Sequence, residues 1–334
     1  MERDADRVGR SSEEVARKNR TDADHVVICN PVSGTEAHLE RVRTLARERG
    51  FSVRITEGEG DGVRFAREAG ADGAELVVAS GGDGTINEVV NGLAEAEALE
   101  RTTLAVVPTG TGNNFASNLG IDDVEAAFDA IDTGRRRRID LGTANGRAFV
   151  NSCVGGLTAE ASGATTPDEK RRLGVLAYVG RALETISSFD SLPIRATLEN
   201  GPDDGGASTR RTWTGEVMLV LVGNCRRFGG TRRAQANVED GLFEVTIVER
   251  APATDLVGEA ALSGLFERGE RHIVRHRVPS LTLESLRSEP IEYSLDGEML
   301  DAETLELETA ANTLEVVVGD GYRPDPDAAG GRSG

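Results

Sequence analysis

Three polar, glycine-bearing loops carry the residues in this chain that are best suited to chemistry. They lie at residues 30–34, 80–85 and 108–115, and each follows a short apolar run typical of a buried strand. Glycines leave backbone N–H groups approachable, and a helix N-terminus attracts anions. If the three strands are neighbours, the loops line one edge of a sheet and predict a phosphate site. For the loop at 80–85 taken alone, a tight strand-to-helix turn that needs positive φ is the alternative.

The loops match neither common nucleotide-binding fingerprint. The motif Gly-x-x-x-x-Gly-Lys-Ser/Thr is absent, and neither lysine of the chain, Lys18 or Lys170, lies in a loop. Asn87 stands where Gly-x-Gly-x-x-Gly needs its third glycine. Phosphate charge must then be met by backbone dipoles, arginine or a divalent ion. Asp83 would repel a phosphate unless a cation lies between them, which points to Mg²⁺.

The first half of the chain alternates predicted strands with predicted helices. The strands are expected at 26–29, 53–55, 75–79 and 104–107, and the helices at 36–48, 62–69, 86–99 and 124–131. This rhythm predicts an α/β domain, with a parallel sheet and helices on both faces. After about residue 140, strand-like runs predict an antiparallel β-sandwich. They lie at 147–154, 194–199, 213–223, 242–249, 272–283 and 290–295, with helical patterns near 173–188 and 254–268.

These patterns predict two domains and two loose ends. The α/β domain is expected at 22–143, with 304–322 returning to it, and the sandwich at 144–303. We expect a disordered arm at 1–21, a disordered tail at 323–334 and a mobile hairpin tip at 201–206.

Composition and charge exclude several classes of protein. The net charge of −19 over 334 residues argues against a nucleic-acid binder, which needs a basic face. The longest apolar run, at 217–222, is far shorter than the ~20 residues of a transmembrane helix. Residues 1–24 lack the apolar core of a secretory signal and the three cysteines are isolated, so we expect a cytoplasmic protein. Acid excess with two lysines is typical of a halophilic, salt-adapted surface, with biased genome composition as the alternative.

The ordered motifs resemble those of the diacylglycerol and sphingosine kinases, especially their soluble prokaryotic lipid-kinase relatives. The resemblance covers about residues 24–320. It rests on Asn30-Pro31-x-Ser33-Gly34, Gly81-Gly82-Asp83-Gly84-Thr85-x-Asn87-Glu88-Val89-Val90-Asn91-Gly92, Pro108-x-Gly110-Thr111-Gly112-Asn113, Ile139-Asp140-Leu141-Gly142, Glu239-Asp240-Gly241-Leu242-Phe243 and Asp296-Gly297-Glu298. It implies a nucleotide-binding α/β domain, a β-sandwich domain and a diacylglycerol kinase-like transfer of the γ-phosphate of ATP to a lipid hydroxyl in phospholipid metabolism.

The resemblance also implies roles for individual residues. Glu298 would be the general base and Asp296 its neighbour in the charge network, while Asp83 and Asp140 would surround the catalytic Mg²⁺. Asn237, Asp240 and Leu242 match a second, structural Mg²⁺ position, for which an acidic hairpin loop is the alternative. Asn114 departs from the Asp of many relatives and removes one carboxylate. ATP would be held by Asn30, Pro31, Val32, Ser33, Gly34, Thr56, Gly81, Gly82, Asp83, Gly84, Thr85, Ile86, Asn87 and Thr111.

Two other functions stay open at this point. An NAD kinase of the same superfamily shares the Gly-Gly-Asp-Gly-Thr turn, but residues 108–113 and 296–298 suit the lipid branch better. A nucleotide-binding regulator without catalysis is the other rival, and intact Asp83 and Glu298 argue against it. The expected partner is a lipid drawn from the membrane surface by a peripherally associated enzyme, and a homodimer is left open. Arg135–Arg138 either contact anionic headgroups or form a solvated connector.

Overall fold

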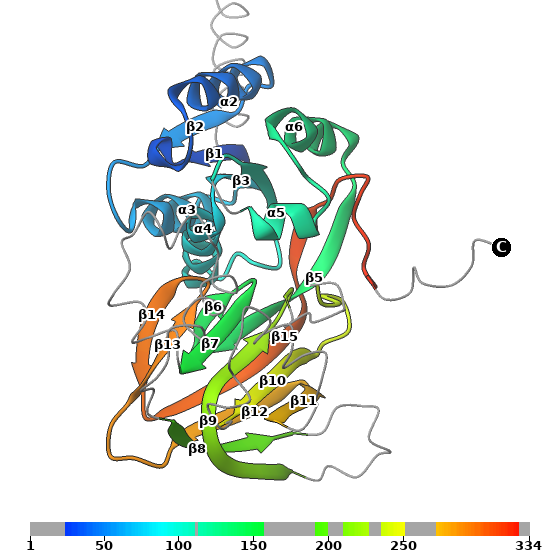
Figure 1. Cartoon of the computed structure of the whole chain (residues 1–334). Helices are drawn as coiled ribbons and strands as arrows, with labels where there is room; N and C mark the ends of the chain where they lie inside the picture. The colour runs from blue at the N-terminus through cyan, green and yellow to red at the C-terminus, as the bar shows by residue number, and fades with distance from the viewer. Residues whose placement is uncertain are drawn as a thin grey trace, which may run out of the picture. The chain divides into compact units, whose positions relative to one another are not determined.

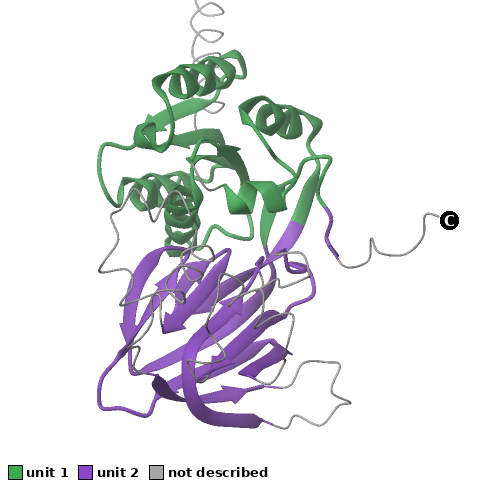
Figure 2. Ribbon diagram, viewed as in Figure 1, with its two compact units in different colours: residues 1–137, 314–322 green, residues 138–313, 323–334 purple. Residues whose placement is uncertain are grey.

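The computed structural model describes residues 24–110, 113–156, 191–199, 210–226, 235–250 and 272–326. The predictions for 1–21, 173–188, 201–206, 254–268 and most of 323–334 lie outside the described residues, as does Thr111. The chain divides into two compact units (Figure 2). Unit 1 comprises residues 1–137 and 314–322, and unit 2 comprises residues 138–313 and 323–334.

Unit 1 is built on a parallel sheet in the order β4-β3-β1-β2. These strands are β1 (His25–Cys29), β2 (Ser52–Ile55), β3 (Leu76–Gly81) and β4 (Thr103–Pro108). Every residue of β3 and β4 is buried, because helices cover both faces of the sheet. A strand covered in this way carries mostly apolar side chains on both faces. The last part of β15 (Thr304–Val317) also runs parallel to β4, with Val316 opposite Leu104.

Helices cover both faces of this sheet, as the strand and helix rhythm predicted (Figure 1). α3 (Asp61–Ala71) and α4 (Asp83–Glu95) pack side by side, and α2 (Glu36–Glu48) packs against α6 (Val124–Thr133). A single turn of 3₁₀ helix, η1 (Pro31–Ser33), follows β1, and the short α5 (Asn114–Asn118) follows the loop after β4. The close α3–α4 packing depends on Gly92, where a Cβ would lie 2.3 Å from the carbonyl oxygen of Val63.

Unit 2 is mostly antiparallel β-structure, in agreement with the predicted fold class. Its central order is β14-β13-β7-β9-β8-β12-β15, with β10 between β9 and β11 and with β5 beside β6 and β15. The stacked rings of Phe149 and Phe243, 5.7 Å apart, lie in the apolar core of this unit. The strands are β5 (Arg136–Ala144, which begins in unit 1), β6 (Arg147–Phe149), β7 (Ser152–Gly156), β8 (Leu192–Leu198), β9 (Arg211–Gly223), β10 (Phe243–Glu249), β11 (Ile273–Val278), β12 (Ser280–Ser285), β13 (Ile291–Leu295) and β14 (Glu298–Ala302).

Three predicted elements have different bounds in the structure. The run 147–154 is two strands, because the backbone at 150–152 turns toward the carboxylate of Asp296. The run 272–283 is also two strands, separated at Pro279, which has no N–H to donate to a ladder. The helix predicted at 86–99 begins earlier, at Asp83, because Gly82 is its N-cap.

Candidate functional site

The loops after β1, β3 and β4 meet at one edge of the unit 1 sheet. Because β1, β3 and β4 are parallel neighbours, their carboxyl ends lie at the same edge. This confirms that the three glycine-bearing loops are adjacent, and Thr56 after β2 joins them. Backbone hydrogen bonds link these chain segments: Asn30 N–H to Ser80 O at 2.9 Å, Thr56 N–H to Cys29 O at 3.0 Å and Thr109 N–H to Gly81 O at 3.1 Å.

The loop glycines allow close contact between backbones. A Cβ on Gly110 would lie 2.5 Å from the Cα of Gly82, and a Cβ on Gly34 would lie 2.9 Å from the carbonyl oxygen of Thr109. Neither glycine has a positive φ, and the φ of Gly82 is −95°. None of the three glycines in the loop at 80–85 has a positive φ, so the tight-turn alternative is wrong for that loop.

The N-terminus of α4 points a set of backbone amides at this edge. Gly82, the N-cap of this helix, has no side chain with which to bind the amides of the first turn. The helix has 13 residues, and its dipole favours an anion at this end. Asn30 Nδ2 donates to Thr85 Oγ1 at 3.2 Å and holds the first loop against the helix. These amides and glycines fit a phosphate group.

The Asp83 carboxylate lies between α4 and α5. Its Oδ1 accepts from the N–H of Phe115 at 3.0 Å, and its Oδ2 accepts from the backbone and side-chain amides of Asn114 at 3.2 and 3.1 Å. Asp83 therefore caps α5. The residue at the N-cap position of that helix, Asn113, makes no side-chain hydrogen bond to it. A single oriented carboxylate fits Mg²⁺, which takes one or two carboxylates together with waters and phosphate oxygens.

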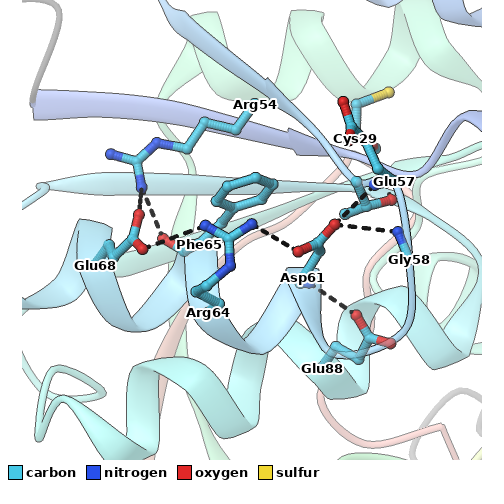
Figure 3. A network of polar contacts seen from close by, with 11 residues as sticks. Cys29, Arg54, Glu57, Gly58, Asp61, Arg64, Phe65, Glu68 and Glu88 are labelled. Carbon is cyan, nitrogen blue, oxygen red and sulfur yellow. Dashed lines mark hydrogen bonds and ion pairs between the residues drawn. The ribbon is translucent and has the colours of Figure 1, made fainter.

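A second network fixes the segment that follows Thr56 (Figure 3). The carboxylate of Asp61 accepts from the N–H groups of Glu57 and Gly58 at 2.8 and 3.1 Å, and the first of these bonds is the main reason that its pKa is lowered. Glu88 of α4 accepts from the N–H of Gly62 at 3.0 Å. Gly60, the N-cap of α3, offers no side chain, so Glu88 supplies the anion at this helix start.

Unit 2 presents Glu298 at a two-residue hairpin turn. Asp296 and Gly297 both have positive φ, 51° and 106°, and Leu295 pairs with Glu298 across the turn. Glu298 is exposed at the start of β14, and no other described residue binds its carboxylate. The hairpin interpretation of this motif is confirmed, and a hairpin tip also leaves the carboxylate accessible.

Asp296 binds backbone amides with its carboxylate. One oxygen accepts from the N–H of Val150 at 2.6 Å, and the other accepts from Asn151 and Ser152 at 2.9 Å each. The N–H of Asp296 in turn donates to Ser152 O at 3.0 Å. The side chain therefore shapes the turn that carries Glu298.

The predicted metal residues of unit 2 gather around the turn at 237–242. Buried Asp140 accepts from the N–H groups of Gly241 at 2.7 Å and Asn312 at 2.8 Å. Burial raises the pKa of Asp140, these bonds oppose the shift, and the nearby Asp240 and Glu239 add to it.

Asn237, Asp240 and Leu242 belong to this same turn. The Asn237 oxygen accepts from the N–H of Glu239, and the Asp240 carboxylate accepts from the N–H of Leu242 and pairs with Arg277. Burial raises the pKa of Asp240, while Arg277 lowers it. Within the described ranges, no group of three or more His, Cys, Asp or Glu side chains forms a ready metal site. The structural Mg²⁺ position stays a prediction.

Comparison with known proteins places the chain in a family. Residues 24–144 match the diacylglycerol kinase catalytic domain, and residues 151–318 match the YegS C-terminal NAD kinase beta sandwich-like domain. A diacylglycerol kinase of Bacillus subtilis (strain 168) is 34% identical over 282 residues, which cover 81% of this chain and 88% of that protein. The chain belongs to the family of diacylglycerol kinases and YegS-like lipid kinases.

Further relatives of this family agree in sequence and in fold. The protein of Pseudomonas aeruginosa (strain UCBPP-PA14) named "Probable lipid kinase YegS-like" is 35% identical over 303 residues, covering 88% of this chain and 94% of the relative. A crystal structure of a diacylglycerol kinase from Bacillus anthracis str. Sterne has a TM-score of 0.69 at 25% identity, covering 89% of this chain and 98% of the other. In the described part of this family member, no helix is both long and apolar enough to cross a membrane.

The structure adds contacts for two groups of residues whose roles sequence reasoning left open or did not assign. The sequence showed Glu88 only as part of a motif and did not predict its contact with Gly62. Gly62 lies 26 positions away and has no side chain that would indicate a hydrogen bond. Within the arginine run, Arg135 pairs with Asp320 at 2.8 Å and Arg136 pairs with Glu315 at 3.5 Å. These ion pairs favour the connector interpretation over a headgroup site.

Proposed function

We propose that this chain is an ATP- and Mg²⁺-dependent lipid kinase. The convergence of three glycine-bearing loops at the N-terminus of α4, beside the oriented carboxylate of Asp83, carries the proposal. The family of the chain supports a lipid as the acceptor. The acceptor would be a hydroxyl of a diacylglycerol-like or long-chain lipid, reached by peripheral association with the membrane surface.

Positioning and charge neutralisation would supply most of the rate. The amides of the first turn of α4 would hold phosphate oxygens, and Asn30 and Thr56 would bound the site. Mg²⁺ held by Asp83 would neutralise charge on the phosphates. The lipid oxygen bonds to the γ-phosphorus as the bond from that phosphorus to the β,γ-bridging oxygen breaks. ADP leaves with the bridging oxygen, and the hydroxyl proton passes to the carboxylate of Glu298.

The test is transfer of label from γ-labelled ATP into total lipid of the source organism, at low and high salt, with identification of the product. Asp83→Ala and Glu298→Ala should each lose transfer. Glu298→Ala should unfold at a temperature close to that of the wild type, whereas Asp83→Ala should unfold at a lower temperature, because Asp83 also caps α5. Near-normal turnover of Glu298→Ala would overturn the assignment of the base. A matched control is Glu292→Ala, which removes an acidic side chain from the neighbouring β13.

An NAD kinase is the second candidate, because the C-terminal match is to an NAD kinase beta sandwich-like domain. The same assay with NAD in place of lipid separates the two enzymes. Label in NAD and none in lipid would replace the lipid-kinase proposal. ATP binding without transfer to either acceptor would favour a nucleotide-binding regulator instead.

A further inference from the structure

Asn224 joins two turns of unit 2 that sequence reasoning treated separately. It follows β9 directly and is 1% exposed. Its backbone N–H donates to Asn151 O at 2.9 Å, and its side-chain Nδ2 donates to Val150 O at 3.0 Å. Val150 and Asn151 are two of the three residues whose amides bind the carboxylate of Asp296.

The same side-chain nitrogen also contacts Asp140 of β5, which binds the turn at 237–242. Nδ2 of Asn224 also donates to the carbonyl oxygen of Asp140 at 3.0 Å. The N–H of Asp140 donates to Val238 O at 2.7 Å, and its carboxylate accepts from Gly241. One buried NH₂ group therefore binds the backbone of Asp140 and the backbone of Val150, whose N–H binds the carboxylate of Asp296.

The chemistry of this position requires an amide. Both contacts of Nδ2 are carbonyl oxygens, which accept only, so two N–H donors must point at them. A carboxylate of the same shape would place oxygen against oxygen. An apolar side chain would take this donor from the carbonyl oxygen of Asp140 and leave that of Val150 with only the N–H of Cys225, at 3.2 Å. Buried acceptors that lose their donor move or admit water, and the segments that carry them move too.

We propose that Asn224 is a positioning residue that fixes the Glu298 turn and Asp140 relative to each other within unit 2. The inference rests on the proposed function, since it assigns a purpose to the geometry of Glu298. Asn224 performs no chemistry itself. It acts through Val150 and Asn151, then through Asp296, which lies two residues before Glu298.

The first test separates catalytic turnover from ATP binding. Asn224→Asp and the milder Asn224→Ser should each lower kcat for lipid phosphorylation by about tenfold or more, with KM for ATP changed by less than about twofold. Asn145→Asp is the matched control. Its side chain also joins two segments of unit 2, the turn between β5 and β6 and the strand β15, through Thr304 O at 3.1 Å and the N–H of Glu306 at 2.9 Å. It contacts neither of the two turns that Asn224 joins. A kcat loss in Asn145→Asp equal to that in Asn224→Asp would overturn the proposal.

The second test does not depend on kinase activity. Amide hydrogen exchange of the Asn224→Ser full-length chain should speed up at 150–152 and at 241, while β10 and β11 keep wild-type exchange. Faster exchange across the whole sandwich, or at neither turn, would overturn the proposal. If the wild type transfers no phosphate but the local exchange pattern appears, the proposed function fails and the positioning role stands.

Discussion

The side-chain amide of Asn114 donates to the carboxylate of Asp83 at 3.1 Å. The family resemblance leads us to expect Asp at this position, where a second carboxylate would repel the first unless a cation lay between them. In this chain the side-chain amide of Asn114 orients the carboxylate of Asp83 through a hydrogen bond that needs no metal ion. The substitution therefore changes the charge beside the proposed Mg²⁺ and keeps the position of its ligand.

Asn114→Asp should make the protein more dependent on Mg²⁺. Without the ion, two facing carboxylates should lower the melting temperature, while saturating Mg²⁺ should restore it and half-maximal activity should need less of the ion. Thermal unfolding and activity across a Mg²⁺ titration check both effects. Asn145→Asp, in the other unit, is the control. An unchanged Mg²⁺ dependence would remove Asp83 from the metal site.

Glu88→Ala should weaken ATP binding more than it slows transfer. Loss of its bond to Gly62 frees the start of α3 and the loop that carries Thr56, so KM for ATP should rise several-fold while kcat changes little. The cost in the free energy of unfolding should be about 1–2 kcal/mol. Steady-state kinetics and chemical unfolding measure these quantities.

The matched control for Glu88 lies on the same helix. Glu95 of α4 also reaches α3, through an exposed ion pair with Arg67 at 3.3 Å. Glu95→Ala removes the same charge and an α3–α4 link without touching the loop. If Glu95→Ala raises KM as much as Glu88→Ala does, the loop is not what Glu88 positions.

Gly110→Ala should reduce nucleotide affinity and leave the fold in place. Its Cβ would collide with the Cα of Gly82, and neither backbone can retreat as a flexible side chain would. Overpacking of this kind costs about 1–3 kcal/mol, which corresponds to roughly tenfold or more in affinity if the site absorbs the strain. Calorimetric titration with ATP measures the loss. Gly58→Ala, where a Cβ meets nothing within 4 Å, should bind normally.

The ion pair of Arg49 and Asp132 predicts a pH-dependent share of stability. The hydrogen bond from Arg49 lowers the pKa of Asp132 below the ordinary value of an aspartate side chain. The contribution of the ion pair to the free energy of unfolding is therefore fully present above the pKa of Asp132 in the unfolded chain. It disappears as the pH falls through the lower pKa of Asp132 in the folded protein. Because the Asp132 side chain is 52% exposed, we expect less than about 1 kcal/mol at pH 7, and less still in high salt.

Chemical unfolding of Asp132→Asn from pH 7 downward checks this prediction. The difference from the wild type should narrow toward acid pH and narrow with added salt. Asp129→Asn, on the same helix, is the control, since the carboxylate of Asp129 acts on Arg49 through its charge but forms no ion pair among the described residues. A difference that is the same at every pH would show that the effect is not electrostatic.

Local sequence patterns predicted most elements that position the site. The buried strands β1, β3 and β4 and the whole of α2 lie within two residues of their predicted bounds, because apolar periodicity is a property of neighbouring residues. The start of α4 was missed because the glycines of the loop are poor helix formers, whereas in the structure Gly82 is the N-cap and Gly84 lies in the first turn.

The sequence by itself determined the two-part fold, the three glycine-bearing loops and the family of the chain. Tertiary structure alone decided that Asp83 meets Asn114, that Glu88 meets Gly62 and that Asp296 binds amides about 145 positions away. The physical reason is that these bonds join a carboxylate to donors from a different element, two of them backbone N–H groups that every residue except proline carries. The packing of helices and strands that lie far apart in the sequence decides which of those donors a carboxylate reaches.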